Sequence, residues 1–128
     1  MKILGPFSTG AATGGAGVAT ANVTPAITIK GLVKAIYVKY LGSPPATTDI
    51  TVATSGVVHP AVTLLSLVNK NTDGWFYPRV VSQSALGVDV TYDGTRPIYE
   101  PAPIYDTVKF TIAQANDADY AEFWILYE

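Results

Sequence analysis

Residues 106–128 read DTVKFTIAQANDADYAEFWILYE, and this stretch decides the fold class. Its first part alternates between apolar side chains (Val108, Phe110 and Ile112) and polar ones, which is the period of a β-strand with one buried face. The NDAD turn at 116–119 then leads into a second apolar and aromatic run. We therefore expect two neighbouring strands here, with Val108, Phe110 and Ile112 directed into a core.

The same period of two extends over the preceding part of the chain. Further strands are predicted at 31–42, 49–54, 61–69, 75–85 and 88–92, separated by turn sequences such as SPPATT, NTDG and DGTRP. No segment carries a convincing helical period. The sequence therefore predicts an all-β fold, an antiparallel β-sandwich or jelly roll of about seven to eight strands.

The first 26 residues have a different texture. The run STGAATGGAGVATANVTPA, residues 8–26, consists almost entirely of small side chains, which bury too little apolar area to offset the entropy of ordering the backbone. We expect an extended Gly/Ala/Thr-rich arm at 1–26 and a β-sandwich domain at 27–128. The arm is either a flexible tail or a segment that becomes ordered on a neighbouring subunit, where Val18 and Thr20 would contribute to the interface.

The stretch NTDGWFYPR, residues 71–79, places three aromatic residues directly after a turn signal. In a strand, Trp75 and Tyr77 share one face with Arg79, whereas Phe76 takes the core face. Pro78 donates no ladder hydrogen bond, which favours an edge strand or a bulge. Trp, Tyr and Arg are the residue types of binding hot spots, so we expect Trp75, Tyr77 and Arg79 at an interface. The alternative is that both faces are covered within the monomer.

The composition narrows the class of protein. Charged residues make up 14% of the 128 residues, compared with roughly 25% in typical soluble domains, and the mean hydropathy is +0.26. A surface with so few charges suggests burial against other subunits. The 8 basic residues form no cluster, which argues against nucleic acid as a partner, and no apolar run of about 18 residues predicts a membrane span. The start lacks the apolar segment of a signal peptide, so we expect synthesis in a cytoplasm.

No enzyme signature emerges from the sequence. His59 is the only histidine, and no serine lies in a G-x-S-x-G motif, which argues against a catalytic triad. Asp117 and Asp119 are spaced as possible calcium ligands, but the twelve-residue loop with its closing glutamate is missing, so an ordinary turn is favoured. With no cysteine in the chain, thiolate metal sites are excluded. We expect no catalytic, metal or cofactor site.

Three segments together carry a family resemblance: IYVKYLGSPPATTDITVAT (36–54), LVNKNTDGWFYPRV (67–80) and VKFTIAQANDADYAEFWIL (108–126). In segment order and texture, residues 30–127 resemble small virion structural proteins of tailed bacteriophages. The resemblance implies a β-sandwich-like protein present in many copies in a particle. We therefore expect a capsid decoration or cement protein in the virion, with the major coat protein and copies of itself as partners and with a trimer favoured.

Two other functions remain open. Tyr92 and Tyr99 are further residues that we expect at the subunit interface. A carbohydrate- or receptor-binding β module of a fibre or spike would instead use Trp75, Tyr77, Tyr92 and Tyr99 to stack on sugars. A sugar site needs polar hydrogen-bonding groups beside a flat ring, whereas a subunit interface needs a contiguous apolar patch. A neck or tail component would share the fold and differ only in its partner.

Overall fold

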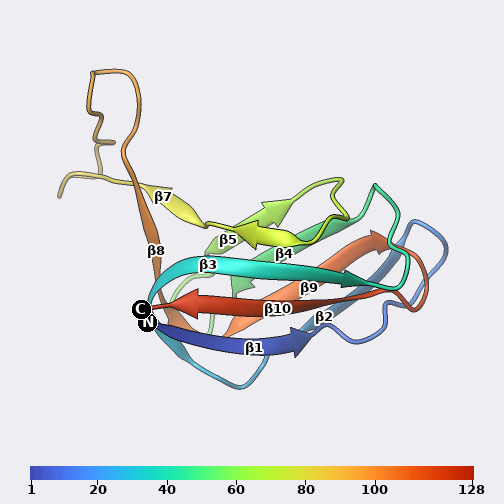
Figure 1. The fold of residues 1–128 in the computed structure, drawn as a ribbon. Coiled ribbons are helices and arrows are strands. Elements are labelled where there is room, and N and C mark those ends of the chain that lie inside the picture. The colour runs from blue at the N-terminus through green and yellow to red at the C-terminus, as the bar shows by residue number, and fades with distance from the viewer.

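The computed structural model describes all 128 residues and contains ten β-strands and no helix, as Figure 1 shows. The strands are β1 (Lys2–Ser8), β2 (Ala19–Val23), β3 (Ile29–Leu41), β4 (Asp49–Thr54), β5 (Thr63–Leu67), β6 (Gly74–Phe76), β7 (Arg79–Val81), β8 (Tyr99–Asp106), β9 (Val108–Ala115) and β10 (Tyr120–Tyr127). No helix that could span a membrane is present.

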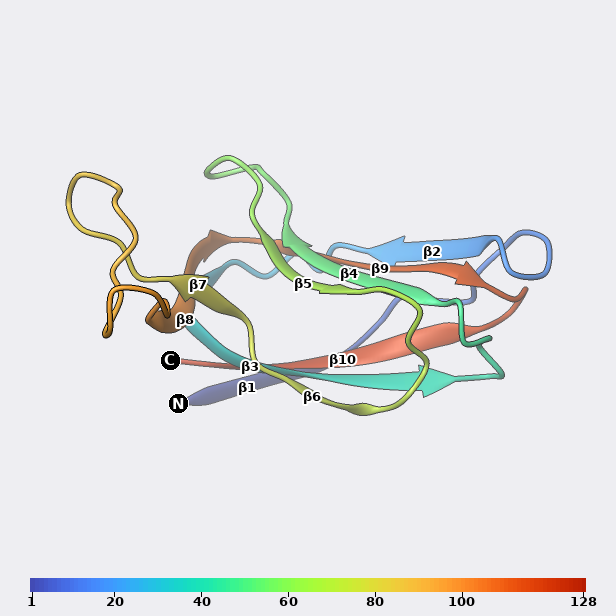
Figure 2. The same cartoon turned by 90° about the horizontal axis from the view of Figure 1, so that it is seen from above.

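The strands form two antiparallel sheets that lie face to face (Figure 2). The larger sheet has the order β1-β10-β3-β8-β7, with β6 also paired to β3, and the smaller sheet has the order β2-β9-β4-β5. Apart from β6 and β7, the chain forms four nested pairs (β1 with β10, β2 with β9, β3 with β8 and β4 with β5) that alternate between the sheets. This order is that of a jelly roll, so the predicted fold class is confirmed.

The core lies between the sheets and follows the predicted alternation. Phe110 of β9 stacks on Phe123 of β10 with ring centroids 4.7 Å apart, and Phe7 of β1 stacks on Phe110 at 5.5 Å. Val108 and Ile112 are buried on the same face of β9, as the sequence predicts. Full burial of side chains of this size stabilises the fold by about 1.5–3 kcal/mol each.

Three strands of the sandwich were not predicted from the sequence: β8, and β1 and β2, which lie in the expected arm. β8 contains Pro101 and Pro103, which cannot donate ladder hydrogen bonds and which normally argue against a strand. In the structure, residues 99–101 pair only with β7 and residues 102–106 pair only with β3. Each half of β8 is therefore an edge, where proline is tolerated because its nitrogen can face away from the neighbouring strand.

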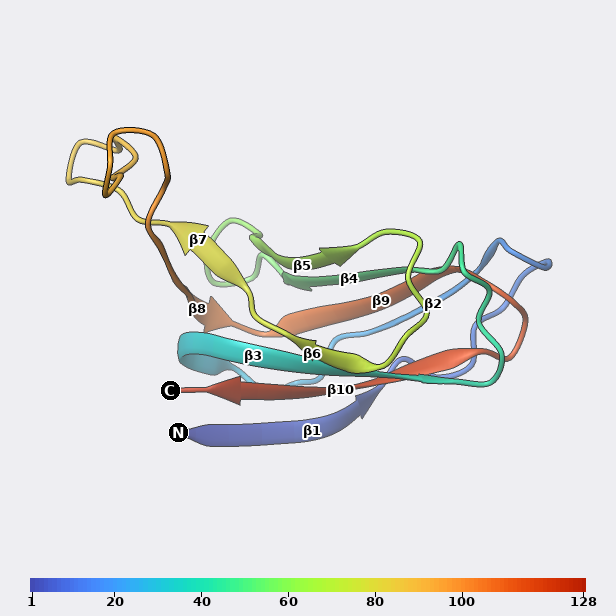
Figure 3. The same cartoon turned by 45° about the horizontal axis from the view of Figure 1, so that its top comes forward.

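The strand predicted at 88–92 does not form. Isolated bridges, Gln83 with Asp89 and Thr91 with Pro97, tie this part of the chain together instead. Figure 3 shows the connection from β7 to β8 projecting away from the two sheets. We call residues 82–98 the projecting loop.

The first 26 residues differ from the expected arm because they belong to the sandwich of their own chain. β1 pairs with β10 at one edge of the larger sheet, and β2 pairs with β9 at one edge of the smaller sheet. Ala12, between these strands, and Ala19, the first residue of β2, are at most 1% exposed and are part of the core. Backbone pairing with two sheet edges orders this segment, and its small side chains allow close approach where they meet the core.

Candidate protein-interaction surface

A row of aromatic rings crosses the outer face of the larger sheet. Trp124 of β10 lies directly opposite Tyr37 of β3, and Tyr37 lies directly opposite Trp75 of β6. The Tyr37 ring meets both indoles edge-on, with centroids 5.7 Å from Trp124 and 5.2 Å from Trp75. With Ile3 of β1, these three rings line a shallow hollow of about 280 Å³. We call Ile3, Tyr37, Trp75 and Trp124 the aromatic patch.

The strand period places these rings outside the core. Phe123 and Ile125 flank Trp124 and are fully buried, so the intervening indole faces the opposite side of the sheet. On the neighbouring strand, Gly5 lets the backbone of β1 pass close to Trp124. A side-chain carbon at Gly5 would lie 2.9 Å from Trp124 Cδ1 and 2.6 Å from the Phe123 carbonyl oxygen, and the φ angle of +135° also favours glycine.

The aromatic patch is apolar and open to solvent. Ile3 is 57% exposed and Trp75 is 44% exposed, whereas Tyr37 and Trp124 are half-buried beneath them. No carboxylate, amide or amine group lines the hollow. Contiguous exposed apolar surface of this kind marks interaction sites in soluble proteins.

Next to the aromatic patch, the chain turns at Pro78 and exposes Tyr77. The strand predicted at 75–85 is instead divided here: β6 ends at Phe76, Pro78 is buried, and β7 begins at Arg79. Each of the two short strands pairs on one side only, as expected of an edge strand. Phe76 packs against the core, as expected, whereas Tyr77 is 62% exposed. The Arg79 guanidinium lies 5.8 Å from the Tyr77 ring, and its Nη1 donates to the carbonyl oxygens of Lys34 and Pro78. Trp75, Tyr77 and Arg79 are thus neighbours at a sheet edge.

A turn contact holds the start of β6 in place. The Asp73 side chain accepts a hydrogen bond from the backbone N–H of Tyr40 on β3, with 2.8 Å between nitrogen and oxygen. β6 itself is only three residues long, from Gly74 to Phe76. The NTDG turn therefore fixes the register that brings Trp75 opposite Tyr37.

Tyr92 and Tyr99, also predicted at the interface, lie elsewhere. Tyr92 is on the projecting loop, and Tyr99 begins β8 at the base of that loop. The guanidinium of Arg96 lies 5.3 Å from the Tyr92 ring and pairs with Asp93 at 2.7 Å. Hydrogen bonds from the Arg96 and Thr95 backbone N–H groups, together with the Arg96 side chain, lower the pKa of Asp93 below its usual value. The turn is thus internally ordered although it is exposed.

Val18 and Thr20 occupy a third region, beside the smaller sheet. Val18 is exposed in the turn that precedes β2. The hydroxyl of Thr20 on β2 donates to the carbonyl oxygen of Ile112 on β9, at 2.9 Å. The seven residues predicted at an interface therefore fall into three separate places. Trp75 belongs to the aromatic patch, Tyr77 and Arg79 lie beside it, and the other four residues lie elsewhere.

Ile3, Tyr37 and Trp124 were not predicted as members of a site. The alternation of the sequence indicates that Tyr37 and Trp124 share the outward side of their strands. Their proximity to Trp75 depends on the pairing of β10, β3 and β6, which the sequence alone does not specify.

The polar residues considered for chemistry have structural contacts. His59 Nδ1 lies 2.8 Å from the Pro60 carbonyl oxygen, and His59 Nε2 lies within hydrogen-bonding reach of the Tyr105 N–H. The two carboxylate oxygens of Asp119 accept hydrogen bonds from the N–H groups of Ser43 and Asn116, which is the turn role favoured by the sequence. No group of three or more His, Asp or Glu side chains is placed to hold a metal ion.

The arrangement as a whole offers two kinds of exposed aromatic surface. The aromatic patch is apolar and lies on a sheet, whereas Tyr92 lies on the projecting loop among polar groups. Comparison of this chain with protein-family models, with curated proteins and with solved structures finds no match.

Proposed function

We propose that this chain is a non-enzymatic structural component of a bacteriophage virion, a capsid decoration or cement protein that binds the coat-protein lattice. The aromatic patch is the observation that carries the proposal, because it supplies an apolar, solvent-open contact surface on a rigid sheet. Aromatic anchors in such surfaces typically dominate the binding energy of protein–protein interfaces.

The geometry of the aromatic patch favours a protein partner over a sugar. Tyr37 meets Trp75 and Trp124 at interplanar angles of 64° and 69°, so the three rings do not form a flat platform on which a sugar ring can stack. The hollow also lacks the polar side chains that orient sugar hydroxyl groups.

Three broader considerations support a place in a particle. The jelly roll is an architecture used by viral capsid domains, although it also occurs in lectins, so the fold supports the proposal only by analogy. The resemblance of residues 30–127 to small virion proteins of tailed bacteriophages points the same way. The low fraction of charged residues, 14%, suits a protein whose surface is partly covered in an assembly.

The proposed partners are the major coat protein and further copies of this chain, with a trimer as the favoured oligomer. With 8 basic and 10 acidic residues, the chain does not carry the positive field that would attract nucleic acid. The proposed location is the virion, after synthesis in the host cytoplasm.

The proposal is tested on purified particles. Virions of the phage that encodes this chain should contain it in many copies by quantitative mass spectrometry, and electron microscopy should place it on the capsid surface. Light scattering of the isolated protein measures its oligomeric state. Absence of the chain from purified virions would contradict the proposal, and density at the neck or tail would replace decoration with a neck or tail role.

A second candidate function rests on the projecting loop. Tyr92 is exposed beside Asp93 and Arg96, which combines an aromatic face with hydrogen-bonding groups, as a sugar site requires. A carbohydrate- or receptor-binding module would therefore use Tyr92 rather than Trp75. Binding to a glycan array that is abolished by Tyr92→Ala and retained by Trp75→Ala would favour this function.

A further inference from the structure

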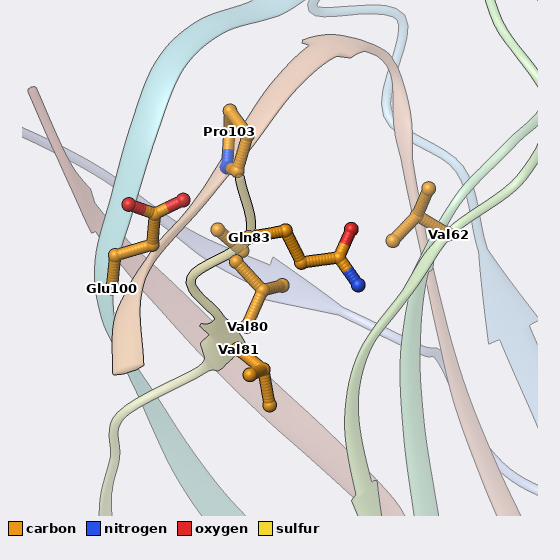
Figure 4. A pocket seen from close by; sticks show the side chains of 7 residues that line it. Val62, Val80, Val81, Gln83, Glu100 and Pro103 are labelled. Carbon is orange, nitrogen blue, oxygen red and sulfur yellow. The ribbon is translucent and has the colours of Figure 1, made fainter. Parts of the chain in front are cut away.

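A pocket of about 470 Å³ opens between the β7–β8 ribbon and the connection that leads into β5 (Figure 4). Its lining consists of Val62, Val80, Val81, Gln83, Glu100, Ala102 and Pro103. Figure 4 shows Val62 on the opposite side of the pocket from Glu100, with the Gln83 amide extending toward Val62. The volume lies within the range of about 300–1,000 Å³ that is typical of ligand pockets.

The walls of the pocket continue the inner face of the larger sheet. Val80 of β7 lies directly opposite Glu100 of β8 and packs against the core, and Ala102 is buried two residues further along β8. The strand period therefore directs Glu100 to the same side of the ribbon as Ala102. A carboxylate thus stands at the rim of an otherwise mostly aliphatic pocket.

The pocket offers hydrogen-bond acceptors to a cationic group. Gln83 Nε2 donates to Asp89 Oδ1 at 2.9 Å, which leaves Gln83 Oε1 for an incoming donor. The two ion pairs of the chain are Lys34 with Glu128 and Arg96 with Asp93, so Glu100 has no cationic partner. Asp89, held against Gln83, adds a second negative charge nearby.

We infer that this pocket binds the cationic side chain, lysine or arginine, of a partner protein. The aliphatic stem of such a side chain would lie along Val62, Val80 and Ala102, and its charged head would meet the Glu100 carboxylate. A neutral apolar side chain would desolvate Glu100 without pairing it, and an anion would be repelled. This surface is separate from the aromatic patch, so the inference stands whether or not that patch binds a coat lattice.

The inference is tested by titrating the ¹⁵N-labelled chain with Nα-acetyl-lysine methylamide and Nα-acetyl-arginine methylamide. Amide signals of pocket residues should shift with a Kd of roughly millimolar strength, as expected for a single side chain. Nα-acetyl-norleucine methylamide, which has an aliphatic side chain without the charge, should bind more weakly. Added NaCl should weaken the cationic probes because the contact is partly exposed.

Substitution identifies the carboxylate responsible. Glu100→Gln should weaken both cationic probes roughly fivefold and leave the rest of the spectrum unchanged, because Glu100 is exposed and unpaired in the free chain. Glu122→Gln, on the outer face of β10, is the matched control and should bind like the wild type.

Equal binding of norleucine and lysine probes to the wild type would overturn the inference even if Glu100→Gln failed to fold. Shifts confined to residues outside the pocket would also overturn it. If the pocket signals shift with protein concentration in the absence of a probe, the occupant is a second copy of this chain, and the assignment to a different partner is wrong.

Discussion

Asp106 illustrates at the scale of one residue how a buried carboxylate orders an exposed loop. Its Oδ2 accepts hydrogen bonds from the consecutive N–H groups of Gly56, Val57 and Val58, and its Oδ1 accepts from the Ser55 hydroxyl and the Thr107 N–H. Desolvation by burial raises the pKa of Asp106, but these hydrogen bonds outweigh it and hold the pKa below its usual value. Three successive N–H groups directed at one anion form an anion-binding nest.

The lowered pKa of Asp106 predicts the direction in which the stability of the fold changes with pH. The Asp106 carboxylate binds a proton less readily in the folded chain than in the unfolded chain. Its contribution to stability is therefore present above the unfolded pKa of about 4 and is lost as the pH falls through the pKa of the folded chain. Asp106→Asn should lower the Tm at neutral pH by roughly 5 °C or more and flatten the loss of Tm on acidification.

Thermal unfolding followed by circular dichroism between about pH 7 and pH 2 measures both effects. Asp117→Asn, an exposed aspartate of the β9–β10 turn, is the control and should unfold like the wild type. A wild-type Tm in Asp106→Asn would show that the hydrogen bonds to this carboxylate do not hold the loop.

The proposed interface predicts that folding and binding can be separated at Trp75 and Tyr77, which are both exposed in the chain. Trp75→Ala combined with Tyr77→Ala should weaken attachment to particles by about 2–4 kcal/mol. The free energy of unfolding should change by only about 1 kcal/mol, because the double substitution removes mainly the edge-on pairing of Trp75 with Tyr37 from the folded monomer.

Co-sedimentation with particles and chemical denaturation of the isolated chain measure the two quantities. Tyr105→Ala is a matched control, since Tyr105 is similarly exposed but lies over Lys30, away from the aromatic patch. If the double variant unfolds readily while its folded fraction still attaches normally, the two rings belong to the monomer and not to an interface.

At the scale of the elements, the sequence predicts strands well where one face is buried. β4, β9 and β10 follow the period of two over most of their length, and their buried residues are those that the alternation indicates. In β3 the pattern changes phase, because the consecutive residues Ala35 and Ile36 are both buried. β8 was missed because Pro101 and Pro103 normally argue against a strand, although an edge strand tolerates them. The alternation around Val88 and Val90 suggested a strand, but the projecting loop has no sheet beside it against which to bury a face.

The aromatic patch was predictable only in part, because some of its members are brought together by pairing between distant strands. Local sequence indicates that Trp75 and Tyr77 turn outward, because a turn, a short strand and Pro78 lie within a few residues of one another. The contributions of Ile3 and Trp124 depend on β1, β10 and β3 being neighbours, which is set by pairing between distant segments.

The place of β1 in the larger sheet predicts that the N-terminal segment is ordered in the isolated chain. Phe7 stacks on Phe110, so Phe7→Ala should reduce the free energy of unfolding by about 2–3 kcal/mol. Ile3→Ala on the outward face of the same strand is the control and should cost less than about 1 kcal/mol.

Amide hydrogen exchange provides a second measurement of this segment. Hydrogen-bonded N–H groups of β1 and β2 should be protected in a proven monomer. If these amides exchange freely in the monomer and become protected only in the particle, residues 1–26 are an arm that orders on assembly.

At the scale of the whole molecule, the jelly roll separates two surfaces of different chemistry. The aromatic patch lies on the outer face of the larger sheet, whereas the pocket with Glu100 at its rim lies where the β7–β8 ribbon leaves the sandwich. Contacts made by the aromatic patch depend on removing apolar area from water, whereas contacts made by the pocket depend on the charge of Glu100. The two surfaces should therefore respond in opposite ways to salt.

This difference predicts how a particle would hold the chain. Attachment through the aromatic patch should persist or strengthen in sodium sulfate, because sulfate favours the burial of apolar surface. A lysine or arginine contact at Glu100 should weaken as NaCl screens it. Co-sedimentation across both salts, with the wild type, Trp75→Ala and Glu100→Gln, separates the contributions. Glu100→Gln should lose the NaCl sensitivity and keep the strengthening by sulfate. Trp75→Ala should be weakened by both salts, because sulfate screens charge as well. If NaCl releases Glu100→Gln as readily as the wild type, the charged contact that holds the chain lies elsewhere on its surface.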